Sequence, residues 1–224
     1  RLFILGKCGS FEELKSLVLR ISIAGLRDPV TGTAAPLHWI ATDRSGKSVV
    51  VEPTEHGLKL YDNRIGVLAN SPDFEWQTTN LRNYMNVSPE QKEAAAWGGV
   101  KLTPFGQAGG TALLPGGYTS PERFVRIAYQ KSHVFLPEGP DEMVAACFHL
   151  MDCVTIPKGS VVTATGAYDY TQYTAFINTD TCEYFFRAYG GSVIETAGLR
   201  EHDFYGDRMV SLGPPVEQPV FLRR

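Results

Sequence analysis

The chain has 224 residues, of which 43% are hydrophobic and 20% are charged, so it is long enough to fold around one sizeable core. Its 21 lysines and arginines against 24 aspartates and glutamates give a formal net charge of −3, and no basic cluster has the density of a nucleic-acid-binding surface. No apolar run approaches the roughly 18 residues of a membrane span. We therefore expect neither nucleic acid nor a membrane as a partner.

The first part of the chain predicts an amphipathic helix followed by an antiparallel meander. Ser10 and Glu13 have the spacing of a capping box, and the apolar residues after them recur at helical period. Short turn sequences then separate stretches that read as strands. These strands are predicted at Leu37–Thr42, Ser48–Glu52, Leu58–Tyr61 and Gly66–Ala69.

Helices are predicted in the middle of the chain. One covers Asp73–Tyr84, and another begins with Ser120 as the N-cap and Pro121 at the first helical position. A third lies within Asp141–Asp152. Between the first two, residues Asn86–Gly117 show no clear periodicity, and a connection this long is usually functional or is an arm that packs on another subunit.

The last part of the chain alternates β-branched and aromatic residues between turn clusters, which predicts further antiparallel strands. The tail after Gly213 is expected to be a loose end. The order of helix, strands, helices and strands excludes a regular βαβ alternation. It predicts an α+β fold, with helices layered on antiparallel sheets, in a single domain over residues 1–224.

The cysteines and histidines indicate no metal site. Cys8, Cys147, Cys153 and Cys182 form no CxxC motif, and none of the five histidines has metal-ligand spacing. Cysteines in an apolar helical stretch are expected to be buried reduced thiols, so we expect a cytoplasmic or at least disulfide-free protein. There is no G-x-S-x-G elbow and no P-loop.

Asn70 stands at the end of a predicted strand, in the sequence Asn-Ser-Pro. Asn70 and Ser71 can cap a turn while Pro72 prevents the strand from continuing. Alternatively, an asparagine amide at a strand end offers a fixed N–H donor of the kind that an oxyanion hole requires. The residues alone leave both interpretations open.

Arg123 lies three residues after the predicted N-cap, in the first turn of a helix, where the helix dipole disfavours a cation. The neighbouring Glu122 has the sign that the dipole favours. Arg123 can form a surface ion pair or extend its charged end into solvent. Alternatively, it faces an acidic group or a nucleophile whose charge offsets the unfavourable position.

Several stretches of the chain carry a resemblance to a known family. They are "PLHWIATDRSGKSVVVEP", "GLKLYDNRIGVLANSPDFEWQTTNLRNY", "LTPFGQAGGTALLPGGYTSPERFVR", "IPKGSVV" and "DYTQYT". Together, from Leu2 to Tyr205, they resemble the choloylglycine hydrolase family, the linear-amide hydrolases that include penicillin V acylases and conjugated bile acid hydrolases. The resemblance implies an N-terminal nucleophile (Ntn) hydrolase with an αββα sandwich. It also implies a small-molecule amide substrate, and no cofactor because the chemistry needs only a cysteine thiol, its own α-amino group and oxyanion donors.

The resemblance also implies roles for particular residues. Asn70 matches the asparagine that supplies the family's oxyanion hole, and Arg123 matches the arginine near the nucleophile's sulfur, where a cation favours the thiolate. The segment Arg82–Pro115 resembles the region through which family members build tetramers, so a homotetramer is expected. Two smaller departures from the family pattern are Gly117, where an aspartate is common, and Ala69, where a threonine is common.

The largest departure is at the start of the chain, where Arg1 stands in place of a nucleophilic cysteine. The chain resembles the C-terminal two thirds of such an enzyme, so we expect the nucleophile in about a hundred preceding residues and no activity from this fragment alone. The expected substrate is an amide like penicillin V, which the last motifs resemble slightly more, or a conjugated bile acid. A second hypothesis is a non-catalytic, degenerate member that acts as a binding or assembly module.

Overall fold

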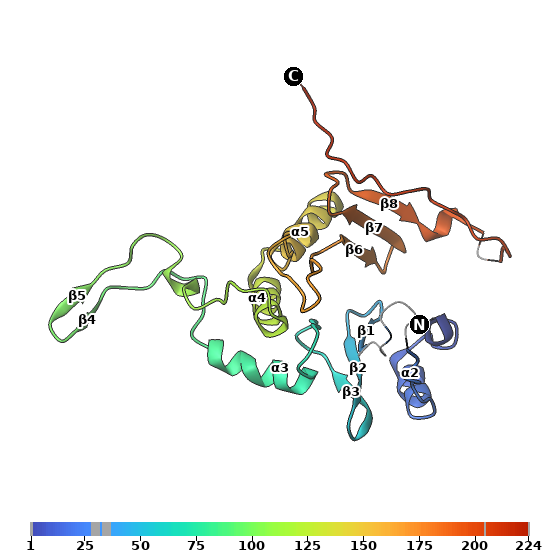
Figure 1. Cartoon of the computed structure of the whole chain (residues 1–224), viewed down its shortest axis with the longest axis horizontal. Helices are drawn as coiled ribbons and strands as arrows, with labels where there is room; N and C mark the ends of the chain where they lie inside the picture. Colours follow the sequence, from blue (N-terminus) through green and yellow to red (C-terminus); the bar gives the residue numbers. More distant parts are fainter. Residues whose placement is uncertain (1, 28–31, 33–36, 204, 224) are drawn as a thin grey trace. The chain divides into compact units, whose positions relative to one another are not determined.

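The computed structural model describes residues 2–27, 32, 37–203 and 205–223 (Figure 1). The chain divides into two compact units, Arg1–Leu136 and Pro137–Arg224. Each unit contains a three-stranded antiparallel sheet, with several helices packed on the sheet of the first unit and one helix packed on that of the second. The α+β class predicted from the sequence is therefore confirmed. The single domain over residues 1–224 stays a prediction.

The sheet of the first unit is the predicted meander. Its strands are β1 (Trp39–Thr42), β2 (Ser48–Thr54) and β3 (Gly57–Asp62). They pair antiparallel in the order β1-β2-β3, with Val50 opposite both Ile40 and Tyr61. Three of the four predicted strands are thus confirmed, with ends that differ by one or two residues.

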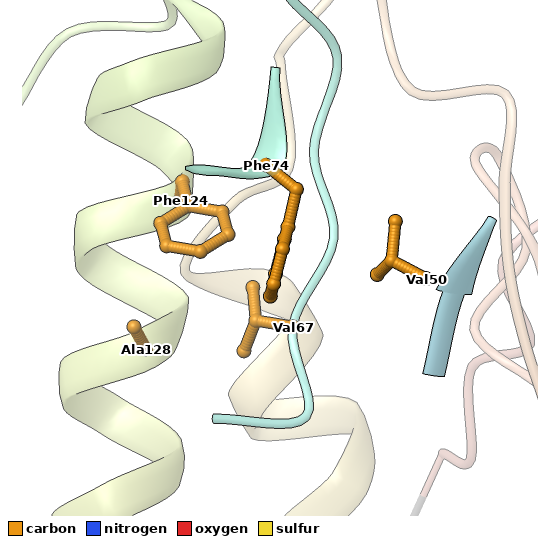
Figure 2. Close-up of a cluster of buried hydrophobic side chains, with 5 residues drawn as sticks. All are labelled: Val50, Val67, Phe74, Phe124 and Ala128. Atoms are coloured by element: carbon orange, nitrogen blue, oxygen red, sulfur yellow. The ribbon is translucent and has the colours of Figure 1, made fainter. Parts of the chain in front are cut away.

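The central strand β2 is buried on both faces, because hydrophobic clusters cover each side of it. Val49 and Val51 pack against Leu14 and Val18 of the first amphipathic helix. Between them along the strand, Val50 points to the opposite face, as strand alternation requires. There it joins a second cluster, which contains Val50, Val67, Phe74, Phe124 and Ala128 (Figure 2).

The amphipathic helix α2 (Phe11–Val18) begins as its sequence predicts. The Ser10 hydroxyl accepts a hydrogen bond from the Glu13 backbone N–H at 3.3 Å, and the Glu13 carboxylate accepts one from the Gly9 N–H at 2.6 Å. Both interactions satisfy backbone donors that a helix start leaves unpaired. A preceding single turn, α1 (Leu2–Leu5), is too short for periodicity to predict.

Two helices cover the second hydrophobic cluster. The predicted helix over Asp73–Tyr84 is found as α3 (Phe74–Asn80), which continues into a 3₁₀ turn, η1 (Leu81–Tyr84). Helix α4 (Ser120–His133) lies against it, and the rings of Phe74 and Phe124 meet edge to face at 6.3 Å (Figure 2). Because Phe124 is completely buried, its side chain contributes about 1.5–3 kcal/mol of hydrophobic stabilisation.

The predicted start of α4 is wrong by one residue, since the N-cap is Thr119 and not Ser120. The Thr119 hydroxyl accepts from the Glu122 N–H, and the Glu122 carboxylate accepts from the Thr119 N–H, which together form a capping box. Thr119 and Ser120 are both good N-cap residues, and the glutamate three positions after Thr119 decides between them.

The predicted strand at Gly66–Ala69 is also wrong, because this segment pairs with no strand of the described chain. The buried amide of Asn63 holds it as a loop. Its Nδ2 donates to the Val67 carbonyl at 3.1 Å, and its Oδ1 accepts from the Gly66 N–H at 2.9 Å. A side chain thus supplies the hydrogen bonds that a neighbouring strand would otherwise give.

The region Asn86–Gly117, which has no clear sequence periodicity, contains an exposed hairpin. Its strands, β4 (Ala95–Trp97) and β5 (Val100–Leu102), extend away from the rest of the first unit (Figure 1). Three-residue strands that are exposed on both faces give no alternating pattern for sequence reasoning to detect. A short 3₁₀ turn, η2 (Gly109–Thr111), lies at the base of this arm.

The second unit contains the predicted third helix and further strands. They are α5 (Pro140–Asp152), β6 (Tyr173–Asn178), β7 (Glu183–Ala188), β8 (Glu195–Gly198) and a 3₁₀ turn, η3 (Leu199–Glu201). The strands pair antiparallel in the order β6-β7-β8. Phe148 of α5 packs against Phe176 of β6, with ring centroids 4.8 Å apart, so the helix covers one face of this sheet. Across the described ranges, no helix combines the length and the apolar character needed to cross a membrane.

Candidate active site

The structure brings together Asn70 and Arg123, the two residues that the sequence singles out, although 53 positions separate them. The Arg123 Nη2 donates a hydrogen bond to Asn70 Oδ1 at 3.0 Å. A guanidinium can only donate, so the oxygen of the Asn70 amide faces Arg123 and the Nδ2 group is turned elsewhere. In the described part of the chain no group accepts a hydrogen bond from that Nδ2, which leaves an oriented N–H donor on an exposed side chain.

The hydrophobic cluster behind the site positions both residues. Asn70 follows a segment in which Val67 is buried and Ala69 packs against the cluster, while Arg123 directly precedes the buried Phe124. Arg123 is the fourth residue of α4, where a cation is unfavourable. Its contacts with acceptors offset this position, since its Nε donates to the Tyr118 carbonyl at 3.1 Å and its Nη2 to Asn70.

At the start of α4, next to Arg123 in the chain, the carboxylate of Glu122 is held by several hydrogen bonds. Glu122 accepts hydrogen bonds from the Thr119 hydroxyl at 2.6 Å, from the Thr119 N–H at 3.2 Å and from the Gly117 N–H at 3.2 Å. The bond from the Thr119 hydroxyl is the main reason why the pKa of Glu122 lies below its usual range. A Cβ atom on Gly117 would lie 2.5 Å from Cδ of Glu122, so this glycine makes room for the carboxylate.

Sequence reasoning missed a third residue of this region, Gln77 on α3. Its side chain is 1% exposed, and its Nε2 donates to the Asn70 backbone carbonyl and to the Ser120 hydroxyl, both at 3.2 Å. The sequence does contain a sign that Gln77 is buried, because it lies one turn after Phe74 on the same apolar face of the predicted helix. A polar residue on a buried helix face requires hydrogen-bond partners.

The first unit has one thiol, that of Cys8, and it does not reach this pair. Cys8 packs with the cluster of Leu14 and Val18, on the face of β2 opposite to Phe124. The other three cysteines belong to the second unit, where burial raises the pKa of the Cys147 thiol. All four cysteines are described, and none of them forms a disulfide. Over the described ranges, no group of three or more histidine, cysteine, aspartate or glutamate side chains could hold a metal ion.

A comparison with models of known protein families identifies the family of the chain. Residues 1–211 match the model described as "Linear amide C-N hydrolases, choloylglycine hydrolase family". The chain therefore belongs to the choloylglycine hydrolase family, as its motifs predict.

Curated relatives agree with this assignment. The conjugated bile acid hydrolase of Lactobacillus gasseri is 35% identical over 200 residues, which cover 89% of this chain and 63% of that protein. The bile salt hydrolase/transferase of Clostridium perfringens is 30% identical over 208 residues, which cover 93% of this chain and 63% of that protein. The chain thus spans somewhat less than two thirds of the length of these relatives.

Solved structures show the same architecture. A mutant of conjugated bile acid hydrolase from Clostridium perfringens aligns with a TM-score of 0.87 and 28% identity, over 99% of this chain and 67% of that one. Penicillin V acylase from Agrobacterium tumefaciens shares the fold with a TM-score of 0.67 and 21% identity, over 89% of this chain and 55% of that one. The Ntn-hydrolase fold expected from the sequence is therefore confirmed.

Proposed function

We propose that this chain is part of a linear-amide hydrolase whose nucleophile is an N-terminal cysteine outside these 224 residues. Asn70 serves as an oxyanion donor and Arg123 stabilises the thiolate. The observation that carries the proposal is the hydrogen bond between Arg123 Nη2 and Asn70 Oδ1 at 3.0 Å. It joins the two residues that match the family's site, and it orients the asparagine amide as an oxyanion donor requires.

Asn70 acts when the thiolate attacks the amide carbonyl and negative charge develops on the carbonyl oxygen. The Nδ2 group then donates a hydrogen bond to that oxygen. One preorganised donor of this kind typically lowers the barrier by about 2.7–4 kcal/mol. The hydrogen bond that Oδ1 already accepts from a cation polarises the amide and makes its N–H groups better donors.

Arg123 has a second effect in this mechanism, through its charge. A cation close to a thiol favours the ionised form and so lowers the pKa of the nucleophile. The nucleophile's own α-amino group is the general base that takes the thiol proton and later delivers a proton to the leaving amine. These steps require no metal and no organic cofactor.

The proposed substrates are an amide like penicillin V and a conjugated bile acid. A curated relative is named conjugated bile acid hydrolase, and a structural neighbour is named penicillin V acylase. The test is the turnover of penicillin V and of glycocholate, measured side by side with the full-length protein. We expect hydrolysis of at least one of the two, and the ratio of kcat/KM values identifies the substrate class. A folded full-length protein that cleaves neither would contradict the proposal and support a binding or assembly role.

We also propose that the full-length protein is a homotetramer assembled through the arm, Arg82–Pro115. Large apolar side chains of this arm are exposed, with Trp97 at 75%, Val100 at 62% and Phe105 fully exposed. Clustered apolar and aromatic side chains of this kind are typical of the centre of a protein interface. Light scattering coupled to size-exclusion chromatography is expected to give four times the chain mass, and a monomeric mass would contradict the assembly.

A further inference from the structure

Gln77 is a buried side chain that connects the two halves of the candidate site. Its Nε2 donates at 3.2 Å to the backbone carbonyl of Asn70 and at 3.2 Å to the hydroxyl of Ser120, the first residue of α4. These acceptors are 7 and 43 positions away in the sequence. The amide of Gln77 therefore joins α3 both to the loop that carries Asn70 and to the helix that carries Arg123.

The contacts form a closed ring. Gln77 holds the backbone of Asn70, the Asn70 side chain accepts from Arg123, and Arg123 belongs to the same first turn as Ser120, which Gln77 also holds. Asn70 is thus fixed at two atoms, its backbone oxygen by Gln77 and its Oδ1 by Arg123. The bond from Gln77 restrains the loop backbone at Asn70 itself, in addition to the packing of Val67 and Ala69 that holds the preceding residues.

We infer that Gln77 is a positioning residue for the hydrolytic reaction, one that holds Asn70 where its Nδ2 can donate to the oxyanion. This inference rests on the proposed oxyanion role of Asn70. The burial of Gln77 supports it, because a side chain that is 1% exposed keeps a single orientation. Its second amide atom, Oε1, is buried and has no hydrogen-bond partner among the described residues, so the two donated bonds alone explain why an amide stands here.

The first test is the variant Gln77→Met in the full-length protein, assayed on whichever of penicillin V and glycocholate the wild type hydrolyses. Methionine keeps the length of the side chain and removes both donated bonds. The unpaired Oε1 is removed as well, which offsets part of the stability loss. We expect kcat to fall by about 10- to 100-fold, as for a misplacement of about 1 Å, with KM and the unfolding midpoint little changed. Gln130→Met is the matched control, because Gln130 is exposed on α4, and its kcat should equal that of the wild type.

The decisive measurement is the same substitution in an Asn70→Ala background. If Gln77 acts through the Asn70 side chain, Gln77→Met lowers kcat in the wild type and has almost no further effect once that side chain is gone. Equal losses in both backgrounds would indicate a general structural role and overturn the inference, as would an unchanged kcat in the single variant.

A second variant covers the case in which Gln77→Met does not fold. Ser120→Ala removes the acceptor on α4 and leaves the bond to Asn70 in place, so a smaller loss of kcat is expected, again absent in the Asn70→Ala background. No loss in either background would overturn the inference. A failure of the proposed function gives a different result. In that event the wild type hydrolyses neither amide, or Asn70→Ala by itself leaves kcat unchanged.

Discussion

Gly117 provides a sharp test of how the start of α4 is built. In Gly117→Ala the new Cβ lies 2.5 Å from Cδ of Glu122, much closer than side chains tolerate, so the carboxylate must leave its place. It then loses its hydrogen bonds from the Gly117 N–H and from the N–H and hydroxyl of Thr119. Losing a capping interaction of this kind costs about 0.5–2 kcal/mol of stability.

Two opposing effects decide whether Gly117→Ala raises or lowers the free energy of unfolding. Replacing glycine by alanine at a position with ordinary backbone angles stabilises a protein by about 0.4–1 kcal/mol, because the unfolded chain loses freedom. We therefore expect a net destabilisation of up to about 1.5 kcal/mol for Gly117→Ala in the wild type. In a Glu122→Ala background no carboxylate has to move, and the same substitution should stabilise the protein by about 0.4–1 kcal/mol.

The assay is denaturant unfolding of the full-length protein for all four members of this cycle. Gly116→Ala is the matched control, because a Cβ built there meets no atom of the described chain within 4 Å, and it should stabilise the protein in both backgrounds. Gly117→Ala should also weaken the acid dependence of stability. The lowered pKa of Glu122 adds stability above the usual carboxyl pKa, and this stability is lost as the pH falls through the lowered value. If Gly117→Ala stabilises the wild type as much as Gly116→Ala does, the anchored carboxylate is refuted.

Three further predictions concern other parts of the molecule. Glu52 is 4% exposed; one of its oxygens accepts a hydrogen bond from the Phe74 N–H at 2.9 Å, and the other lies 2.8 Å from His38 Nδ1. Because Glu52→Ala removes these contacts, it should lower the free energy of unfolding, measured in urea, by about 1–3 kcal/mol. A smaller loss would contradict these contacts. A Cβ on Gly110 would overlap backbone carbonyl oxygens at the base of the arm. If the arm assembles the proposed tetramer, Gly110→Ala should therefore disrupt it in sedimentation experiments, whereas Gly106→Ala, whose Cβ meets open space, should leave it intact. Because burial raises the pKa of Cys147, its labelling by iodoacetamide should begin at higher pH in the folded protein than in urea, and identical pH profiles by mass spectrometry would contradict this.

Much of the fold could be predicted because its signals are local. The Ser10 cap, the apolar faces of the helices and the consecutive valines of β2 each lie within a few residues of one another. The errors are local as well. The segment Gly66–Ala69 has the composition of a strand, but the side chain of Asn63 supplies its hydrogen bonds, and composition cannot show that a side chain will do so.

The candidate site was only partly predictable, because it depends on contacts between distant segments. The sequence singles out Asn70 by its place after a predicted strand, which the structure shows as a loop, and Arg123 by its unfavourable place near a helix start. In the sequence nothing connects these two observations. Their hydrogen bond arises because Val67 and Phe124, which lie close to them in the chain, share one hydrophobic cluster. The contacts of Gln77 depend on the same packing, so only the fold reveals them.

The most direct test of the oxyanion role of Asn70 is the kcat of Asn70→Ala in the full-length protein, measured on the amide that the wild type hydrolyses. Loss of an oxyanion donor should lower kcat by about 10²–10³-fold, with the protein folded and KM changed little. A kcat within about twofold of the wild type corresponds to a change of less than about 0.5 kcal/mol in the barrier. It would show that Asn70 only turns the chain, and would contradict its role as an oxyanion donor.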